Sequence, residues 1–156
     1  MSESLKRVKE EAIKLALELD VIEIKMAKTA LEAAREIGCE VEEIAKSIVM
    51  KSEANNYYLF ICSGIHMVDI GKASSLTKQR LKIASPKEIR EYTGFAIGGV
   101  SPIGHKKEVK KIFDCYLTTL KQIYAAAGTP NHVLRCDPRQ LLERTNGIEL
   151  DFIKES

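Results

Sequence analysis

Strand-forming runs that follow one another directly restrict the possible fold of this chain more than any other feature. Ile44–Lys51 and Tyr57–Ser63 are both strand candidates, and Asn55-Asn56 between them favours a hairpin turn. Further strand candidates are Val21–Met26, His66–Ile70, Lys111–Leu117, Gln122–Ala127, His132–Cys136 and Ile148–Ile153. Strands without helices between them favour antiparallel pairing over a doubly wound parallel arrangement. The sequence therefore predicts an α/β domain with a mixed, mainly antiparallel sheet and flanking helices.

Helix signals lie at the start of the chain and between the strand candidates. An apolar residue recurs every three or four positions at Leu5, Val8, Ala12, Leu15 and Leu19. This spacing predicts an amphipathic helix over roughly Ser4–Leu19, within residues 1–20, that packs on the sheet. Capping residues predict further helices from Thr29 to Gly38, from Ser74 or Ser75 to Ile83, from Ser85 to Gly94, and from Asp137 to Asn146.

Chain length and hydrophobic content limit the number of domains. The chain has 156 residues, 45% of them hydrophobic, which suffices for one core and fits the usual size of one domain. We therefore expect residues 1–156 to form a single domain. No apolar stretch approaches the roughly 20 residues of a membrane span, and Met1–Asp20 lacks a signal-peptide core. We expect no membrane partner and a cytoplasmic location.

The cysteines and histidines show no pattern typical of a metal or redox site. Four cysteines lie far apart without a C-x-x-C pair and are expected to be buried free thiols: Cys39, Cys62, Cys115 and Cys136. Three histidines are not spaced like ligands of one metal and form no recognisable Ser-His-Asp order: His66, His105 and His132. No G-x-G-x-x-G follows an early strand, which argues against dinucleotide binding. We expect neither a metal nor a cofactor.

Positive charge is concentrated in the middle third of the chain. Residues 64–112 hold 10 basic and 4 acidic side chains, although the whole chain has a net charge of only +2. Such a bias can form a patch for a polyanion, and it can equally be a solvated face. Taken alone, the charge distribution decides between neither.

The basic region surrounds a glycine-rich segment, Gly98-Gly99-Val100-Ser101-Pro102-Ile103-Gly104-His105. Adjacent glycines leave their amides unshielded by a Cβ, and Pro102 fixes its own φ and restrains the residue before it. Such a loop can direct N–H groups at an oxygen atom. The apolar run Phe95-Ala96-Ile97 is interpreted as a strand that leads into it. A glycine-rich bend between two strands, without a ligand, is the alternative.

Lys46 is the most suggestive single residue outside the glycine-rich loop. If Ile44–Lys51 is a strand, Lys46 shares a face with Ile44, Ile48 and Met50. A lysine among apolar neighbours usually needs an anionic partner, either in the protein or in a ligand. The alternative is that the stem of Lys46 lies along the strand end and its ammonium reaches water.

Three other polar residues have ordinary structural explanations. Thr29 and Asp137 are placed to cap helices, although helix N-termini also attract anions and often line clefts. Ser101 could act as a nucleophile only beside a base, and the sequence places no such base. We therefore expect no covalent mechanism.

Three segments carry a family resemblance: Ile44–Val49 around Lys46, the Thr29–Gly38 helix, and Tyr92–Gly104 with its glycine-rich loop. Together they resemble the YbaK/EbsC family of aminoacyl-tRNA deacylases, which is similar to the editing domain inserted in bacterial prolyl-tRNA synthetases. The similarity runs from about Lys25 to the C-terminus and includes Gly128-Thr129-Pro130 and Leu134–Pro138. The resemblance implies that residues 25–156 form an editing domain.

The resemblance also implies an activity and a set of site residues. A freestanding domain of this kind hydrolyses, in trans, the ester that joins a wrong amino acid to the 3′ adenosine of a tRNA. Lys46 matches the family's essential lysine, and Gly98–Pro102 matches its G-x-x-x-P loop, so the implied catalytic residues are Lys46, Gly98 and Gly99. The implied substrate-binding residues are Thr29, Val100, Ser101, Pro102, Gly104 and Asp137. The attacking group is water, or a thiol or hydroxyl of the substrate, and no cofactor or metal is implied.

Family members remove different small amino acids, so the resemblance implies Cys- or Ala-tRNA(Pro) as substrate without choosing between them. Implied partners are the acceptor end of aminoacyl-tRNA and prolyl-tRNA synthetase. One alternative is a non-catalytic module that binds tRNA, a nucleotide or a synthetase. Another is a structural or protein-interaction domain, for which the basic middle third is incidental.

Overall fold

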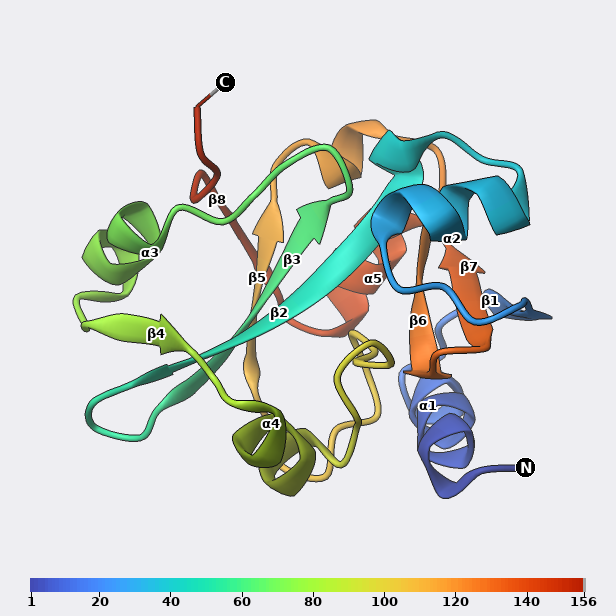
Figure 1. The fold of residues 1–156 in the computed structure, drawn as a ribbon, viewed down its shortest axis with the longest axis horizontal. Coiled ribbons are helices and arrows are strands. Elements are labelled where there is room, and N and C mark those ends of the chain that lie inside the picture. Colours follow the sequence, from blue (N-terminus) through green and yellow to red (C-terminus); the bar gives the residue numbers. More distant parts are fainter. Residues whose placement is uncertain (156) are drawn as a thin grey trace.

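Residues 1–155, which the computed structural model describes, form one mixed sheet of eight strands (Figure 1). The strands are β1 (Leu19–Glu23), β2 (Ile44–Ser52), β3 (Tyr57–Ser63), β4 (Leu81–Ile83), β5 (Lys110–Asp114), β6 (Ile123–Thr129), β7 (His132–Cys136) and β8 (Ile148–Leu150). Their order is β1-β7-β6-β2-β3-β5-β8, and β4 pairs with β2. Four strand pairs are antiparallel and three are parallel, which confirms the predicted sheet type.

Five α-helices and two short 3₁₀ turns flank this sheet within the described part of the chain. The helices are α1 (Glu3–Lys14), α2 (Ala30–Ile37), α3 (Ile70–Thr77), α4 (Pro86–Thr93) and α5 (Pro138–Arg144), and the 3₁₀ turns are η1 (Val41–Glu43) and η2 (Leu117–Thr119). In Figure 1, α2 lies near one end of β2, and α3 and β4 lie near the other end. Helix α1 packs against β6, as predicted for the N-terminal helix.

The helix boundaries follow from local capping chemistry. Thr29 and Ser85 accept hydrogen bonds from the third residue of α2 and α4, and Pro86 occupies the first position of α4. Gly38 and Gly94 end these helices in the left-handed conformation. These predictions are confirmed, and so are the β2–β3 hairpin with Asn55 in its turn at a φ of 61° and the cap of α5 at Asp137.

Side chains of β2 alternate between two apolar layers. Ala45 and Val49 belong to the larger core, which α1, α4, α5 and the glycine-rich loop complete. On the opposite face of β2, Ile44 packs in one cluster with residues of α2, and Met50 packs in another cluster with Phe60 and Phe152. The alternation confirms that Ile44, Lys46, Ile48 and Met50 share one face of the strand.

The N-terminal helix is shorter than predicted. The N-terminal helix ends at Lys14, because Ala16 takes a φ of 52° and the Leu17 N–H bonds back to the Ala12 carbonyl. Leu19 then begins β1 instead of continuing the apolar face of the helix. Apart from His66–Ile70 and Phe95–Ile97, the predicted strands from Val21 onward each match an observed strand and differ from it mainly at their ends.

The segment 66–83 differs most from its prediction. His66–Ile70 is a loop with one bridge between Val68 and Ile153, because Asp69 caps α3 and the helix starts at Ile70. Ser74 and Ser75 therefore lie inside α3 rather than before it. Lys78 ends α3 in the left-handed conformation, and the predicted helical residues Leu81–Ile83 form β4 on the edge of β2.

The cysteines are free thiols, but they are not all buried. Cys62 and Cys136 are buried, Cys39 is half-buried and Cys115 is exposed. Burial of Cys115 was wrongly predicted because the residue follows β5 at the surface rather than lying within the strand. No helix within residues 1–155 is both long enough and apolar enough to cross a membrane.

Candidate active site

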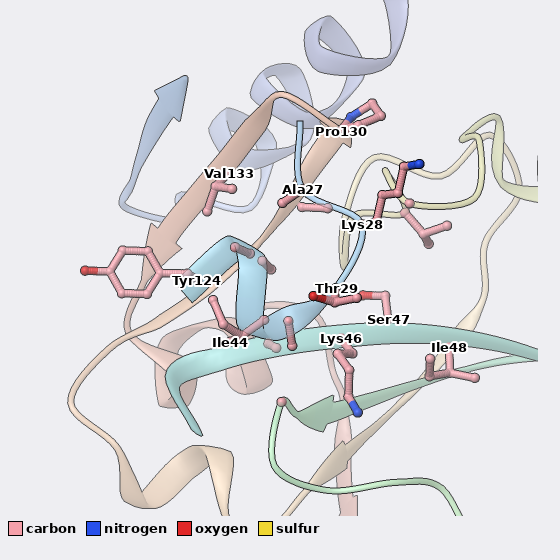
Figure 2. Close-up of a pocket in the computed structure, with 18 of the residues that line it drawn as sticks. Ala27, Lys28, Thr29, Ile44, Lys46, Ser47, Ile48, Tyr124, Pro130 and Val133 are labelled. Carbon is pink, nitrogen blue, oxygen red and sulfur yellow. The ribbon is translucent and has the colours of Figure 1, made fainter. Parts of the chain in front are cut away.

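A cavity of about 770 Å³ opens where β2 lacks a continuous neighbour on one side. Strand β6 pairs with β2 at Ile44 and Ala45, and β4 pairs with it from Met50 onward. Between these pairings, residues 46–48 of β2 border an opening in the sheet. Helix α2, the glycine-rich loop and the β6–β7 turn surround the opening (Figure 2). The cavity is thus built from segments far apart in sequence.

Most of the cavity wall is apolar. Ile24, Ala30, Ala33, Ile37, Ile44, Ile48 and Val133 are among the residues that line it. The polar side chains at the wall are Lys28, Thr29, Lys46, Ser47, Tyr124, Thr129 and His132, and His66 also belongs to the lining. A mainly apolar pocket with a few polar groups is typical of a site for a small molecule or a small part of a larger one.

Lys46, the third residue of β2, lines this cavity (Figure 2). Lys46 is half-buried, and its Nζ donates to the main-chain oxygen of His66 over 2.5 Å. The carbonyl takes the place of the anionic partner that the sequence suggested. Lys46 is therefore held by the protein at the cavity wall rather than being free at a strand end.

Cys62 is the cross-strand neighbour of Lys46 on β3. Burial raises the pKa of its thiol to about 11, although the charge of Lys46 acts in the opposite direction. The thiol therefore stays protonated near neutral pH, and its Sγ contacts the same His66 carbonyl at 3.3 Å. Cys62 provides no thiolate nucleophile at this site.

The glycine-rich loop reaches the cavity with only part of its length. Gly98 and Val100 line the cavity, together with Ile97. The loop follows the Gly94 cap of α4 directly, so the predicted strand over Phe95–Ile97 is wrong and a helix delivers the loop. Lys46 and Gly98 nonetheless lie on the wall of one cavity, as the resemblance implied.

Gly99 faces the protein instead of the cavity. Its N–H donates to the Ala96 carbonyl over 3.0 Å, so this amide is already engaged within the loop. A Cβ on Gly99 would come within 3.0 Å of the Thr129 main chain. Glycine is needed here for the close approach of the loop to the β6–β7 turn.

The second half of the loop is its buried support. Ser101 is fully buried, and its Oγ accepts from the Ile103 N–H while its carbonyl accepts from His105 Nε2 at 2.7 Å. Pro102 is also buried, and Gly104 packs against α1 at Val8. None of these three predicted substrate-binding residues belongs to the cavity lining.

Thr29 and Asp137 are separated by the structure. Thr29 lies at the cavity and caps α2 through its Oγ1, which accepts from the Glu32 N–H at 3.1 Å. Asp137 is exposed and caps α5, where it accepts from the Arg139 N–H at 2.9 Å. Asp137 does not belong to the cavity lining, because β7 carries it away from the β6–β7 turn.

Sequence reasoning missed three polar features of the site. The Ser47 Oγ is buried and has no hydrogen-bond partner among the described residues. Thr129 Oγ1 and His132 Nδ1 lie 2.7 Å apart at the cavity. His66 Nδ1 lies 2.6 Å from Asp114 Oδ2, a contact across 48 positions of sequence. The position of Ser47 next to Lys46 could have indicated the buried hydroxyl, whereas no local pattern indicated the contact between His66 and Asp114.

The few polar groups on a mainly apolar wall favour binding of an oxygen-rich, partly apolar ligand. Within residues 1–155 no three His, Cys, Asp or Glu side chains gather as they would around a metal ion. An ammonium, an unpartnered hydroxyl and a glycine-rich loop can together contact ester, hydroxyl and phosphate oxygens.

A family model and two relatives match most of the chain. Residues 25–143 match the family model described as "Aminoacyl-tRNA editing domain". YwhH of Bacillus subtilis, an uncharacterized protein, is 30% identical over 141 residues, which cover 90% of each chain. EbsC of Enterococcus faecalis, a proposed Cys-tRNA(Pro)/Cys-tRNA(Cys) deacylase, is 28% identical over 124 residues, covering 76% of this chain and 73% of EbsC.

A solved structure is similar over the whole chain. It is the crystal structure of a protein proposed to be a trans-editing enzyme for prolyl tRNA synthetase, with a TM-score of 0.92 and 39% sequence identity. The alignment covers 100% of this chain and 99% of that one, including α1, which precedes the region matched by the family model. The chain thus belongs to the aminoacyl-tRNA editing domain family, the YbaK-like family that its lysine and glycine-rich loop resembled.

Proposed function

We propose that this protein is a freestanding deacylase that hydrolyses the ester of a mischarged aminoacyl-tRNA, with tRNA(Pro) carrying cysteine or alanine as its substrate. Family membership supports an editing role. The observation that carries the proposal is that Lys46 and Gly98 line one cavity, because a cation and a glycine-rich loop suit the stabilisation of a reacting ester. The acceptor end of the tRNA is the partner in this proposal, and prolyl-tRNA synthetase would supply the mischarged tRNA.

The chemistry requires stabilisation of negative charge on the ester carbonyl oxygen. When water attacks the carbonyl carbon, that oxygen gains charge; the bond to the ribose oxygen then breaks, and a proton from the water ends on the ribose. The Lys46 ammonium supplies positive potential. Gly98 lines the cavity, whereas the Gly99 amide is engaged with Ala96, so Gly98 rather than Gly99 is the glycine donor in this proposal. With Cys-tRNA the cysteine thiol can attack the carbonyl carbon instead of water; the bond to the ribose oxygen breaks, the thiol proton ends on that oxygen, and the cyclic thioester that leaves is then hydrolysed by water.

The remaining residues have binding roles in this proposal. Thr29 and Val100 contribute to the wall against which the aminoacyl group packs. Ser101, Pro102 and Gly104 act indirectly, because they hold the loop from beneath. Asp137 can contact only a part of the tRNA that extends beyond the cavity.

A deacylation panel tests the proposal. Wild-type protein is incubated with tRNA(Pro) charged with cysteine, alanine or proline, and ester loss is followed against buffer alone. We expect hydrolysis of Cys- or Ala-tRNA(Pro), and a fall of about 100-fold or more in the Lys46→Ala variant, as for loss of one charge-stabilising group. Lys82→Ala changes an exposed residue of β4 that does not line the cavity; it is the matched control and keeps wild-type activity.

Two results contradict the proposal. Salt-sensitive binding of tRNA without turnover of any ester identifies a non-catalytic module instead. Equal deacylation rates for Lys46→Ala and the wild type show that Lys46 takes no part in the mechanism.

A further inference from the structure

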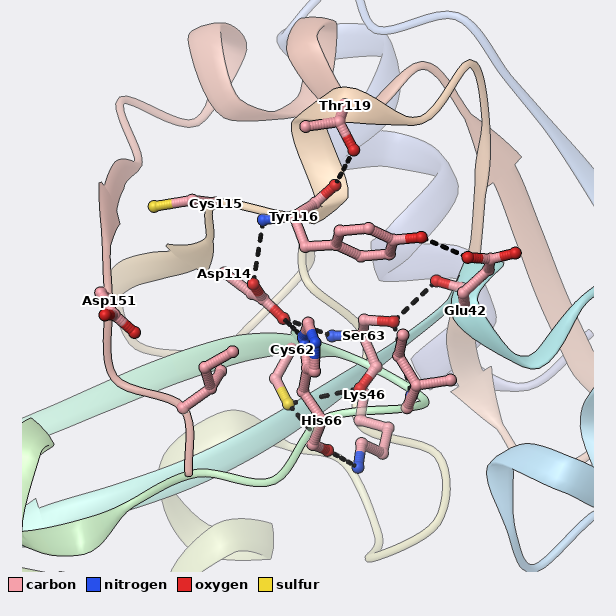
Figure 3. Close-up of polar contacts among 12 residues, drawn as sticks. Glu42, Lys46, Cys62, Ser63, His66, Asp114, Cys115, Tyr116, Thr119 and Asp151 are labelled. Atoms are coloured by element: carbon pink, nitrogen blue, oxygen red, sulfur yellow. Dashed lines mark hydrogen bonds and ion pairs between the residues drawn. The ribbon is translucent and has the colours of Figure 1, made fainter. Parts of the chain in front are cut away.

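One main-chain carbonyl holds the Lys46 side chain in place. Among the described residues, the partner of its Nζ is the His66 oxygen, as Figure 3 shows. An ammonium has three N–H donors, so two donors remain for a substrate. A lysine stem is flexible and loses much rotamer freedom when its end is fixed. The position of the ammonium therefore depends on how firmly the His66 carbonyl is held.

The His66 carbonyl lies outside the regular sheet. It belongs to the turn Ser63–His66, in which the His66 N–H donates to the Ser63 carbonyl over 2.9 Å. The neighbouring side chains Ile65 and Met67 are 54% and 61% exposed, so apolar packing does not anchor this turn. Polar contacts must fix it instead.

The Asp114 carboxylate supplies these contacts from the end of β5 (Figure 3). Its Oδ2 accepts from the Ser63 N–H at 3.1 Å and from His66 Nδ1 at 2.6 Å, which are the two ends of the turn. Its Oδ1 accepts from the Tyr116 N–H at 3.0 Å. The side chain of Asp114 is only 3% exposed, so water competes little for these hydrogen bonds. Because a carboxylate only accepts, Nδ1 is the protonated nitrogen of His66.

A second set of contacts braces the same turn. Tyr116 packs edge-on against the His66 ring at a centroid distance of 5.3 Å, and its hydroxyl donates to the Glu42 carboxylate. Ser63 Oγ donates to the Glu42 carbonyl over 2.8 Å. Glu42 of η1 is thus tied to Ser63, and Tyr116, the residue before η2, is tied to His66. The Asp114 carboxylate contacts Ser63, His66 and Tyr116 (Figure 3).

We propose that Asp114 is a positioning residue of the site, which acts through the His66 side chain to fix the carbonyl that orients the Lys46 ammonium. This inference rests on the proposed function for its effect on catalysis. The His66 ring has a structural role, because it links Asp114 to the turn and takes no part in proton transfer. One hydrogen bond links Asp114 to the His66 ring, and a second links the His66 carbonyl to the Lys46 ammonium.

Three single variants and one double variant separate this role from that of a catalytic imidazole. In Asp114→Asn the amide group must point a donor at one of the three N–H groups, and His66→Ala removes the link while leaving Asp114 in place. We expect kcat to fall by about 10- to 100-fold in each, with KM nearly unchanged, as for residues that orient a reactive group. In His66→Asn the amide nitrogen occupies the place of Nδ1, so most of kcat returns. The double variant Asp114→Asn/His66→Ala is no slower than either single one.

The outcomes that overturn the proposal are specific. If His66→Asn is as slow as His66→Ala, the imidazole itself reacts. If Asp114→Asn keeps wild-type kcat, the carboxylate does not position Lys46. The His66 side chain is 22% exposed, so His66→Ala remains informative even where Asp114→Asn fails to fold.

A second measurement does not depend on deacylation. Native protein is treated briefly with dilute acetic anhydride, and acetylation of Lys46 and Lys87 is quantified by mass spectrometry of their peptides. Lys87 is 84% exposed and serves as the internal control. Release of the His66 carbonyl frees the Lys46 ammonium, so its acetylation rate rises several-fold in Asp114→Asn and His66→Ala relative to Lys87. Unchanged relative rates refute the positioning role, whereas inactivity of the wild type in every deacylation assay refutes only the proposed function.

Discussion

His105 makes the stability of the glycine-rich loop depend on pH. Burial, together with the charges of Lys111 and Arg7, lowers the pKa of His105 to about 3, although its hydrogen bond to the Ser101 carbonyl acts in the opposite direction. Because a carbonyl only accepts, the neutral imidazole carries its proton on Nε2 and donates it to Ser101 over 2.7 Å. The native protein therefore holds His105 uncharged at every pH at which it is expected to work.

The unfolded chain binds a proton at His105 below an ordinary pKa of about 6.5, whereas the native protein does not until about pH 3. The contribution of His105 to stability is therefore complete above about pH 6.5 and is lost as the pH falls toward 3. At pH 5 the loss amounts to about 2 kcal/mol relative to pH 8, and this figure changes little for any native pKa below about 4.

Urea unfolding at pH 8, 6.5 and 5 measures this effect, with His105→Gln as the matched variant. The glutamine amide can still donate to the Ser101 carbonyl but does not titrate, while His66, His132 and the carboxyl groups remain in both proteins. We expect the wild type to lose about 2 kcal/mol more than the variant between pH 8 and pH 5. A stability difference that stays constant across this range refutes the assignment of a buried neutral His105.

Two further predictions concern the turn beneath Lys46 and the thiols. Gly64→Ala places a Cβ 2.4 Å from the Val41 main-chain oxygen, so the turn must shift. We expect the free energy of unfolding in urea to fall by about 1–3 kcal/mol and the deacylation rate to fall as well. An unchanged unfolding midpoint contradicts the close approach. Cys115 is exposed whereas burial raises the pKa of Cys62 to about 11 and that of Cys136 to about 12. A thiol reagent at pH 8 should therefore label Cys115 first in the native protein, and equal labelling of Cys62 shows that β3 opens readily.

Features with a local chemical cause could be predicted from the sequence. The ends of α2 and α4 follow from Thr29, Gly38, Ser85 and Gly94, whose side chains or backbone freedom act within one helical turn. The hairpin of β2 and β3 follows from its turn residues in the same way. The N-terminal helix was predicted too long because the apolar spacing continues into Leu19, where sheet pairing replaces it.

The site depends on pairings that no local pattern contains. Lys46 lies at an opening because β6 and β4, which come from distant parts of the sequence, pair with different ends of β2. Asp114 meets His66 because β5 lies parallel to β3, which sets the end of one strand beside the turn after the other. The family resemblance indicated Lys46 and Gly98, whereas the burial of Ser101 and the distance of Asp137 from the cavity depend on tertiary packing that no motif encodes.

The opening in the sheet has a consequence for how such a site can diversify. The Val49 carbonyl bonds to Ala84 on the opening side of β2, and main-chain groups alternate along a strand, so the N–H and C=O of Ser47 point the same way. Peptide groups are identical whatever side chain a residue carries. Mutation can therefore reshape the apolar walls, and under the proposed function the choice of amino acid with them, while the polar edge of Ser47 is inherited intact.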